Sequence, residues 1–283
     1  MPLKQRLAAS ARAFMNPALR QPRALPSPEP ARVVVDRLLA GKNALVTGAG
    51  RNIGRAIALE IAAHGGSVYC TERVGERAAE LATELAAAGV PSKVFEADIT
   101  KPGDSEAVQA ELAAAGVGID VVVNNVGIVE GEPRDVFETN VLGPMHLTRL
   151  FTQSMIEGAR PGSVVFVSSI HQQTVVRRSP AYSASKGALA MLIKELAVEL
   201  APHRIRVNGV APGWTLEDSD GSPVAHGWAP LEGTSVPPRY IGRAAVHLAS
   251  DHFSRYTTGT TVTIDGGLSL FNYLCAVEAG LHL

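Results

Sequence analysis

The chain has 283 residues, a formal net charge of -1, and 46% hydrophobic against 19% charged residues. These values predict a folded, soluble protein of one or two domains, and they give no electrostatic reason to expect nucleic acid or an anionic membrane as a partner. The two cysteines, Cys70 and Cys275, are too few for a disulfide framework and lack metal-ligand spacing, so we expect a cytoplasmic protein without a metal ion. No apolar run reaches the roughly 18 residues of a membrane span.

Residues 1–40 are predicted to form an extension ahead of the folded domain. The first 28 residues contain five basic side chains and no acidic one, and prolines follow at positions 22, 26 and 28. They lack the apolar core and small-residue cleavage site of a secretory signal. Three interpretations stay open: an organelle transit peptide, a basic arm on a partner subunit, or an untethered extension.

From residue 41 onward, apolar runs alternate with alanine-rich helical patterns. Most runs are continuous, as in strands of a parallel sheet that is covered on both faces. The predicted strands are residues 44–47, 67–71, 93–97, 120–124, 163–168, 206–210 and 260–264. The predicted helices are residues 53–64, 76–88, 104–115, 135–158, 182–201 and 239–249. This order predicts one α/β domain over residues 41–283, a Rossmann-type doubly wound parallel sheet of about seven strands with helices on both faces.

A glycine-rich turn, Thr-Gly-Ala-Gly-Arg-Asn-Ile-Gly at positions 47–54, joins the first strand to the first helix. Glycines permit a tight turn and a close approach to a pyrophosphate, which the free N–H groups of the helix N-terminus would bind. Glycines that merely end a strand are the alternative. The residues expected to bind the cofactor here are Gly48, Arg51, Asn52, Ile53 and Gly54.

The second strand ends at Glu72 and Arg73, which favour different cofactors. An acidic residue at this place accepts hydrogen bonds from the adenosine ribose and repels a 2′-phosphate, which favours NAD. Arg73 would attract that phosphate, which favours NADP. Because the acidic residue stands at the strand tip, we expect NAD rather than NADP; a solvated turn is the alternative.

Polar residues also follow the third and fourth strands, where the ligand crevice of an open parallel sheet lies. Asp98 and Ile99 end the third strand, and Asn125 and Gly127 follow the fourth. We expect Asp98 beside the adenine and the Asn-Gly turn under the cofactor. Ordinary turn chemistry is the alternative.

Ser169 follows the fifth strand, and the next helix opens with Tyr-Ser-Ala-Ser-Lys at 182–186. Positions four apart share a helix face, so Lys186 would stand beside the Tyr182 phenol. A free phenol has a pKa of about 10, and an ammonium group together with an oxidised nicotinamide ring would lower it toward neutrality. Ser169 can hydrogen-bond a substrate oxygen as charge develops on it. The spacing indicates an acid–base pair, and a solvated helix pair is the alternative.

Taken in order, these motifs resemble the short-chain dehydrogenase/reductase family over about residues 41–267. The matching positions are the turn at 47–54, Asp98, Asn-Asn-x-Gly at 124–127, Asn140, Ser169, Tyr182, Lys186, Arg-Val-Asn at 206–208, Pro212-Gly213 and Asp-Gly-Gly at 265–267. The resemblance implies an NAD(P)-dependent enzyme that interconverts an alcohol and a ketone or aldehyde by hydride transfer.

The resemblance also implies roles for individual residues. Tyr182 is the general acid/base, Lys186 lowers its pKa and binds the nicotinamide ribose, and Ser169 holds the substrate oxygen. Asn140 supports a water in the proton relay. At the nicotinamide end, Pro212 and Gly213 flank the ring and Thr215 contacts its carboxamide.

Three departures from the family pattern bear on the site. Asn52 stands where a glycine is expected, and Asn tolerates the left-handed backbone better than most residues. Asn140 stands only fifteen positions after Asn125, and the substrate loop at 214–238 shows no helical period. We therefore expect a more open active site than is usual in this family.

Polar residues past Ser169 suit a hydroxyl-rich substrate, and the segment looks like that of bacterial sugar dehydrogenases of the family. We expect a sugar or polyol in contact with Ser169, His171, Gln172 and Trp214, with solvated loop residues as the alternative. Arg177 and Arg178 could attract an anionic group. A 3-oxoacyl or other ketone is the runner-up, and a non-catalytic dinucleotide-binding sensor or scaffold is the alternative of another class.

The resemblance further implies a homotetramer or a dimer, built partly from the helix that Tyr182 opens. The tail at 268–283 is apolar enough to pack against a neighbouring subunit, and the basic extension can add to that contact.

Overall fold

In the computed structural model, residues 37–175, 179–218, 221–225 and 229–270 are described. Nearly all of the extension at 1–40, Arg177, Arg178 and most of the tail at 268–283 lie outside these residues, so the predictions made for them stay predictions. In the part of the chain that is described, no helix has the length and apolarity needed to cross a bilayer.

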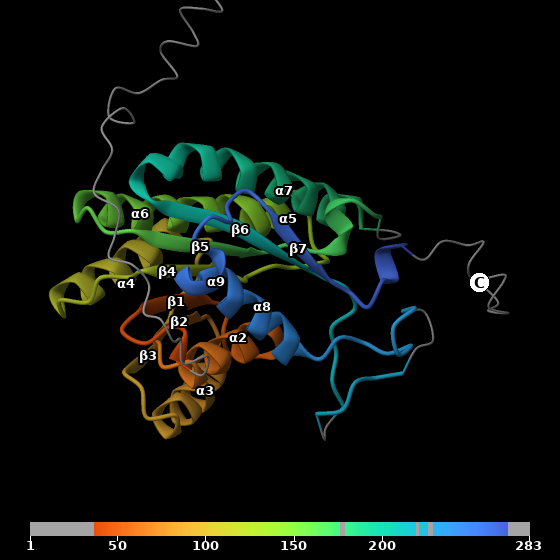
Figure 1. The fold of residues 1–283 in the computed structure, drawn as a ribbon, viewed down its shortest axis with the longest axis horizontal. Coiled ribbons are helices and arrows are strands. Elements are labelled where there is room, and N and C mark those ends of the chain that lie inside the picture. The colour runs from red at the N-terminus through yellow and green to blue at the C-terminus, as the bar shows by residue number, and fades with distance from the viewer. Residues whose placement is uncertain (1–36, 176–178, 219–220, 226–228, 271–283) are drawn as a thin grey trace, which may run out of the picture. The chain divides into compact units, whose positions relative to one another are not determined.

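The fold is built on a seven-stranded parallel sheet in the order β3-β2-β1-β4-β5-β6-β7 (Figure 1). The strands are β1 (Asn43–Thr47), β2 (Ser67–Glu72), β3 (Ser92–Glu96), β4 (Val121–Asn124), β5 (Gly162–Val167), β6 (Ile205–Pro212) and β7 (Thr261–Ile264). This confirms the predicted doubly wound fold. The strand order reverses between β1 and β4, and a crevice for ligands opens at such a switch point.

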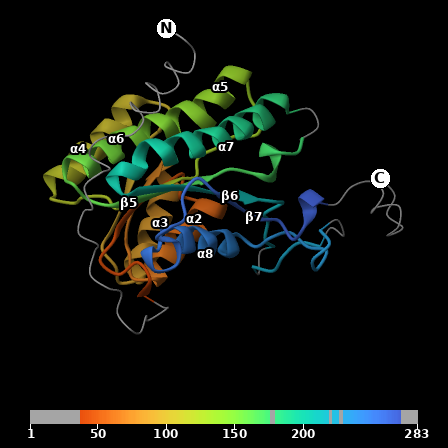
Figure 2. The same cartoon turned by 45° about the horizontal axis from the view of Figure 1, so that its top comes forward.

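Helices cover both faces of the sheet (Figures 1 and 2). One layer holds α2 (Asn52–Ala63), α3 (Gly75–Ala87) and α8 (Pro238–Ala249), and the other holds α4 (Pro102–Ala114), α6 (Gly143–Glu157) and α7 (Pro180–Leu200). The shorter elements are α5 (Pro133–Phe137), a π-helical turn (Glu138–Leu142), α9 (Asp251–Ser254) and the 3-10 turns Ile170–Gln172, Ala201–His203 and Leu268–Leu270.

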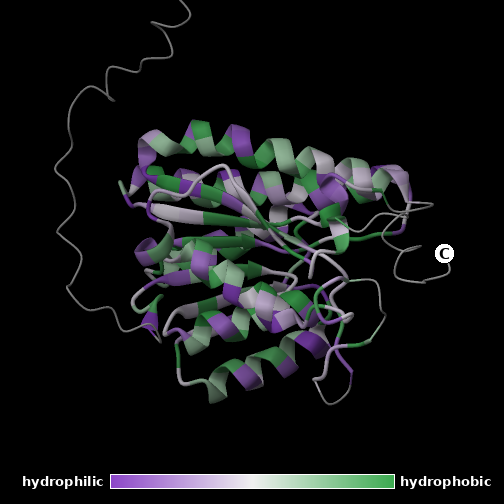
Figure 3. Ribbon diagram, turned by 45° about the vertical axis from the view of Figure 1, so that its right-hand side comes forward, coloured by the Kyte–Doolittle hydropathy of each residue, from purple (hydrophilic) through white to green (hydrophobic). Residues whose placement is uncertain are grey.

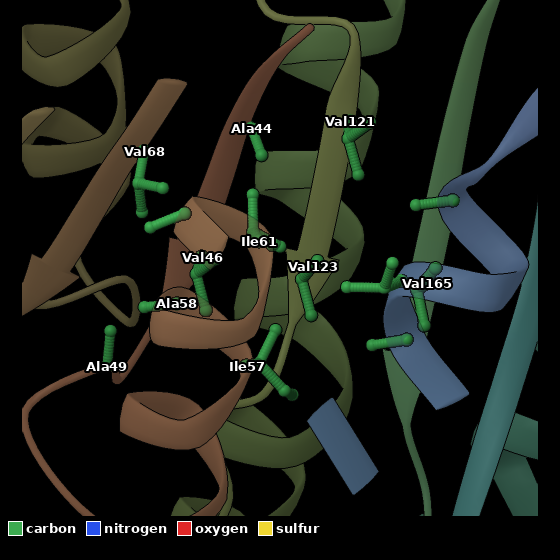
Figure 4. Packing of buried hydrophobic residues seen from close by; sticks show 14 of the residues in the cluster. Ala44, Val46, Ala49, Ile57, Ala58, Ile61, Val68, Val121, Val123 and Val165 are labelled. Carbon is green, nitrogen blue, oxygen red and sulfur yellow. The ribbon is translucent and has the colours of Figure 1, made fainter. Parts of the chain in front are cut away.

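Each face of the sheet has its own apolar core. Ala44, Val46 and Val123 point toward α2, as Figure 4 shows, whereas Leu45 and Val122 belong to the core under α6 and α7. Successive strand side chains point to opposite faces, so a strand buried on both faces must be apolar throughout. Figure 3 shows the matching pattern, with mostly hydrophobic residues along the central strands and alternating hydrophobic and hydrophilic residues along the helices.

The predicted helix at 135–158 differs from the structure. It begins at Pro133 and is interrupted by the π-helical turn Glu138–Leu142, which contains Asn140. Pro144 has no N–H, so the Asn140 carbonyl cannot accept the usual bond from four residues ahead. The wider turn accommodates this proline, and a single-turn π segment often marks a functional position.

The described residues of the loop at 214–238 form no helix before Pro238, as expected. Ser235 holds the loop together, because its hydroxyl donates to the Leu216 carbonyl at 2.8 Å and accepts from the Val224 N–H at 2.8 Å. Arg239 of α8 bonds Glu217 at 3.2 Å and ties the start of the loop to the helix layer.

Candidate active site

A cavity of about 260 Å³ lies at the carboxyl ends of the first four strands. It is lined by the predicted residues Gly48, Arg51, Asn52, Ile53, Gly54, Glu72, Arg73, Asp98, Ile99, Asn125 and Gly127. Sequence reasoning missed the further lining residues Thr71, Arg77, Ala97, Thr100, Val126, Ile128 and Thr139. Most of these are neighbours of predicted positions on the same strand tips. Arg77 lies in the first turn of α3, and no sequence motif pointed to it.

The glycine-rich turn has the backbone shape that its sequence predicts. Gly48 and Asn52 have φ angles of +60° and +48°, so Asn52 does adopt the left-handed conformation where a glycine was expected. A Cβ at Gly54 would lie 2.2 Å from the Gly48 carbonyl oxygen. Only glycine therefore lets α2 start this close to the turn. The first N–H groups of α2 have no partner within the helix and are available to an anion.

Asn125 holds this turn from the side of β4. Its amide Nδ2 donates to the carbonyls of Thr47 at 3.1 Å and Gly48 at 3.0 Å. Its backbone N–H donates to the Thr47 hydroxyl at 3.0 Å. The side chain of Asn125 thus positions the turn, a role that its place in the sequence did not reveal.

Two acidic residues lie along the cavity wall. The buried Glu72 carboxylate accepts from the Gly50 N–H at 3.0 Å and the Val74 N–H at 3.1 Å. Burial acts to raise the pKa of Asp98, but hydrogen bonds from Thr100 and the charges of Arg73 and Lys101 outweigh it and leave the pKa below its usual value. Asp98 is therefore ionised near neutral pH and can accept a hydrogen bond from an amino group.

The first turns of α7 bring Tyr182 and Lys186 onto one face. The Lys186 Nζ lies 5.7 Å from the centroid of the Tyr182 ring and donates to the Val167 carbonyl at 3.0 Å. Burial lowers the pKa of Lys186 to about 8. This side chain is therefore an ammonium group only up to the upper physiological range.

The pKa of Tyr182 is shifted in the protein alone. Burial of the phenol raises the pKa above its usual value, and a hydrogen bond with Ser169 lowers it only in part. The prediction that Lys186 and an oxidised nicotinamide ring lower this pKa concerns the site with its cofactor bound, and it stays a prediction. In the protein alone, the desolvation of the phenolate has the larger effect.

Asn140 links the π-helical turn to the catalytic helix. Its side chain accepts from the Ile128 N–H at 2.8 Å and donates to the Ile128 carbonyl at 2.9 Å and the Ser185 hydroxyl at 2.9 Å. Ser185 in turn donates to the Tyr182 carbonyl at 2.7 Å. The amide group of Asn140 is thus fully engaged and fixes the start of α7.

Gly127 lies between the cavity and the side chains of Lys186 and Asn140. A Cβ at Gly127 would lie 3.4 Å from both the Lys186 Nζ and the Asn140 Oδ1. Because Gly127 also lines the cavity, the lysine ammonium group lies immediately behind the cavity wall.

Residues past Ser169 form a polar group beside the phenol. The His171 ring lies edge-on to Tyr182 with centroids 6.0 Å apart, and its Nδ1 is 3.0 Å from the Thr174 hydroxyl. Burial lowers the pKa of His171, which favours the neutral ring. The Gln172 Oε1 is buried and has no hydrogen-bond partner within the described chain.

The remaining predicted positions lie where β6 enters the loop at 214–238. Pro212 ends β6, and the Gly213 N–H donates to the Ile264 carbonyl at 2.9 Å. The Thr215 hydroxyl donates to the Gly213 carbonyl at 3.2 Å, so it is used within the loop. Trp214 is 42% exposed. No group of three or more metal-binding side chains occurs in the part of the chain that the structure describes.

Comparison with known proteins supplies independent information. Residues 42–223 match the model of the short chain dehydrogenase family. The 3beta-hydroxysteroid dehydrogenase 1 of Eggerthella lenta is 33% identical over 254 residues, which cover 82% of this chain and 95% of that protein. The glucose 1-dehydrogenase of Gluconobacter oxydans is 33% identical over 251 residues, covering 82% and 93%.

Among solved structures, a 7 alpha-hydroxysteroid dehydrogenase complexed with NADH and 7-oxo glycochenodeoxycholic acid superposes with a TM-score of 0.74. It is 28% identical to this chain, and the match covers 82% of this chain and 96% of that one.

Proposed function

Because the chain belongs to the short-chain dehydrogenase/reductase family, and is therefore an NAD(P)-dependent oxidoreductase acting on CH–OH groups, we propose that Tyr182, Ser169, Lys186 and Asn140 form its catalytic centre. The observation that supports this most is the Tyr182 phenol, which shares a hydrogen bond with Ser169 and lies on the Lys186 face of α7. A non-catalytic sensor or scaffold does not account for this arrangement or for the enzyme relatives, so we set that alternative aside.

The residues around the cavity fit a nicotinamide dinucleotide. The close approach at Gly54 and the free N–H groups of α2 suit a pyrophosphate, Glu72 suits the adenosine ribose, and Asp98 suits the adenine amino group. Lys186, behind Gly127, suits the nicotinamide ribose. When bound, the cofactor supplies the hydride acceptor or donor.

The protein groups then move and hold the proton. In alcohol oxidation the substrate hydroxyl gives its proton to the Tyr182 phenolate as the hydride leaves the carbon, and in carbonyl reduction the phenol returns it. Ser169 hydrogen-bonds the substrate oxygen while its charge changes. The Lys186 ammonium favours the phenolate, and Asn140 fixes α7 through Ser185.

We propose NAD as the preferred cofactor. The buried Glu72 carboxylate at the tip of β2 would repel a 2′-phosphate. Arg73 and Arg77 line the same cavity, and their positive charges would attract a 2′-phosphate, which favours NADP. The related steroid dehydrogenase structure contains NADH. Dissociation constants of NAD and NADP for the unmodified protein test the preference, and tighter binding of NADP would reverse it.

We propose a sugar or polyol as substrate, on the basis of the polar group after Ser169. Thr174 has one hydroxyl proton and donates it to the Ile170 carbonyl at 3.0 Å, so it accepts from the His171 Nδ1. This tautomer leaves Nε2 as a hydrogen-bond acceptor, which suits a second hydroxyl group of a substrate. The related glucose dehydrogenase agrees with this choice.

A larger apolar ketone or alcohol is the second candidate. Val129, Val175 and Trp214 are exposed by 48%, 85% and 42%, and all three follow strands at the end of the sheet where the catalytic groups lie. Apolar side chains there suit a hydrophobic substrate body, and the related 3beta-hydroxysteroid dehydrogenase 1 agrees with this choice.

A Tyr182→Phe variant tests the catalytic proposal. A panel of sugars, polyols, steroids and 3-oxoacyl compounds is first screened for a change in cofactor absorbance. With the best substrate, Tyr182→Phe should lose at least about a thousandfold in kcat, because it removes the only proton donor we assign to the substrate oxygen. Its affinity for the cofactor should stay close to that of the parent.

The matched control is Tyr240→Phe, which alters an exposed tyrosine on α8 and should leave kcat unchanged. Turnover of Tyr182→Phe at the parent rate would overturn the mechanism.

A further inference from the structure

We propose that Glu72 positions the glycine-rich turn for the pyrophosphate, in addition to facing the adenosine ribose. This inference rests on the proposed dinucleotide site. It assigns to the carboxylate a second function that acts through the backbone of the turn. The two functions predict different responses to shortened ligands, which allows a direct test.

The contacts of Glu72 join the end of β2 to the middle of the turn. One carboxylate oxygen accepts from the Gly50 N–H at 3.0 Å, and the other accepts from the Val74 N–H at 3.1 Å. Beside them, the Ala49 N–H donates to the Thr71 carbonyl at 3.2 Å. Two successive amides of the turn are therefore bound to the last two residues of β2.

The fit at Gly50 is close. A Cβ at Gly50 would lie 2.6 Å from the Glu72 Oε2 and 2.8 Å from the Arg77 Cβ, so only glycine lets the turn lie on this carboxylate. Glu72 itself is only 6% exposed. A buried, charge-assisted hydrogen bond to a backbone N–H is stronger than a neutral one, and it also partly compensates for the burial of the charge.

The turn needs such support because its backbone is strained. Asn52 has a φ angle of +48°, which side chains of L residues rarely adopt. Strained residues persist only where the surrounding structure fixes them. Asn125 holds the turn at Thr47 and Gly48 from the side of β4, and Glu72 holds it at Gly50 from the side of β2.

The hydrogen bonds between the turn and β2 also decide which N–H groups of the turn face the ligand. Ala49 and Gly50 donate their N–H groups to β2, whereas the first N–H groups of α2, which begins at Asn52, have no partner within the helix and can bind an anion. Loss of the Glu72 carboxylate would free Gly50 and let the turn relax away from this orientation.

The test compares two ligands, ADP-ribose and adenosine, on the parent and on Glu72→Ala. Both ligands present the ribose to residue 72, but only ADP-ribose carries the pyrophosphate. We expect Glu72→Ala to weaken ADP-ribose at least tenfold more than it weakens adenosine, as measured by calorimetry and by NMR titration. Glu72→Gln, whose amide oxygen can still accept from Gly50, should recover part of that difference.

The matched control is Glu76→Ala, which removes an exposed carboxylate from the first turn of α3 and should change neither affinity. Equal losses for the two ligands would overturn the inference and leave Glu72 acting on the ribose alone. Unchanged binding of ADP-ribose would instead overturn the proposed site. If Glu72→Ala does not fold, as judged by its melting temperature, the same comparison is made with Glu72→Gln.

Discussion

Tyr182 and Lys186 have pKa values that burial shifts in opposite directions. Burial raises the pKa of the phenol and lowers that of the lysine to about 8, because in both cases the uncharged form is favoured away from water. The protein alone therefore keeps the phenol protonated, ready to act as an acid. An ammonium group remains behind it only below about pH 8.

The first prediction concerns the pH dependence of carbonyl reduction. With reduced cofactor saturating, kcat/KM should fall as the pH rises through about 8, because Lys186 then loses the charge that supports the phenolate formed at Tyr182. The measurement is kcat/KM for a non-ionisable ketone between pH 6 and pH 10. A flat profile across this range would contradict the assignment, and Lys186→Met should be slow at every pH.

Loss of stability does not explain such a fall. The folded-state pKa of Lys186 lies below its ordinary value of 10.5, so the unfolded chain binds more protons between about pH 8 and 10.5. The contribution of this group to the free energy of unfolding therefore rises with pH in that window. Thermal melts at each pH provide the control.

Parts of the site that depend on residues close together in the sequence were predictable from the sequence. The Tyr182–Lys186 pair follows from helix geometry, and the left-handed Asn52 follows from the family pattern and the tolerance of Asn for this conformation. The hydrogen bonds that Glu72 and Asn125 make with the turn were not predictable, because they link segments that only the folded sheet brings together. The direction of the Tyr182 pKa shift depends on burial, which spacing does not reveal.

Among the elements, the start of α2 is the most tightly fitted. A Cβ at Gly54 would lie 2.2 Å from the Gly48 carbonyl and 2.5 Å from the Asn125 Nδ2, so any side chain pushes the helix away from the turn. Because Gly54 has no side chain, α2 can begin next to the turn, where its first N–H groups are available to an anion.

The second prediction follows for Gly54→Ala. This change should lower the free energy of unfolding by about 1–3 kcal/mol, because it overpacks a backbone contact, and should weaken cofactor binding at least tenfold. Chemical denaturation and calorimetry measure the two effects. Gly103→Ala, in α4, is the control: a Cβ there meets nothing within 4 Å, so stability should change by less than about 1 kcal/mol. Normal cofactor binding by Gly54→Ala would contradict the role of the turn.

The helix that follows β4 shows where periodicity fails. Apolar spacing predicted one helix over 135–158, but the hydrogen bonding changes at Glu138–Leu142. The missing N–H of Pro144 was the available signal.

At the scale of the whole molecule, the outer surface of α7 bears on assembly. Met191 and Val198 are 57% and 65% exposed on this helix, which also carries Tyr182. Exposed apolar side chains on one helix are suited to contact with a second copy. We propose, as the family resemblance implies, that the chain forms a homo-oligomer through this helix.

The third prediction is therefore a mass in solution of two or four times 29.7 kDa. Light scattering coupled to size-exclusion chromatography measures it. Replacing Met191 and Val198 by Glu should lower the mass, whereas replacing the exposed Tyr256 by Glu serves as the control. A monomeric mass for the parent would contradict the proposal, and the chain without residues 1–30 tests whether the basic extension contributes.

The order of the strands has a consequence for how the chain reaches its fold. β1 lies in the middle of the sheet, where Ala44 pairs with Val68 on one side and with Val121 on the other. During synthesis β2 and β3 emerge soon after β1, but the other edge of β1 stays unpaired until β4 has been made. An open apolar strand edge invites aggregation, and parallel pairing across such a long segment is slow. The nascent chain therefore carries an open apolar edge on β1 from the synthesis of this strand until that of β4, and protection of this edge matters before the chain is complete.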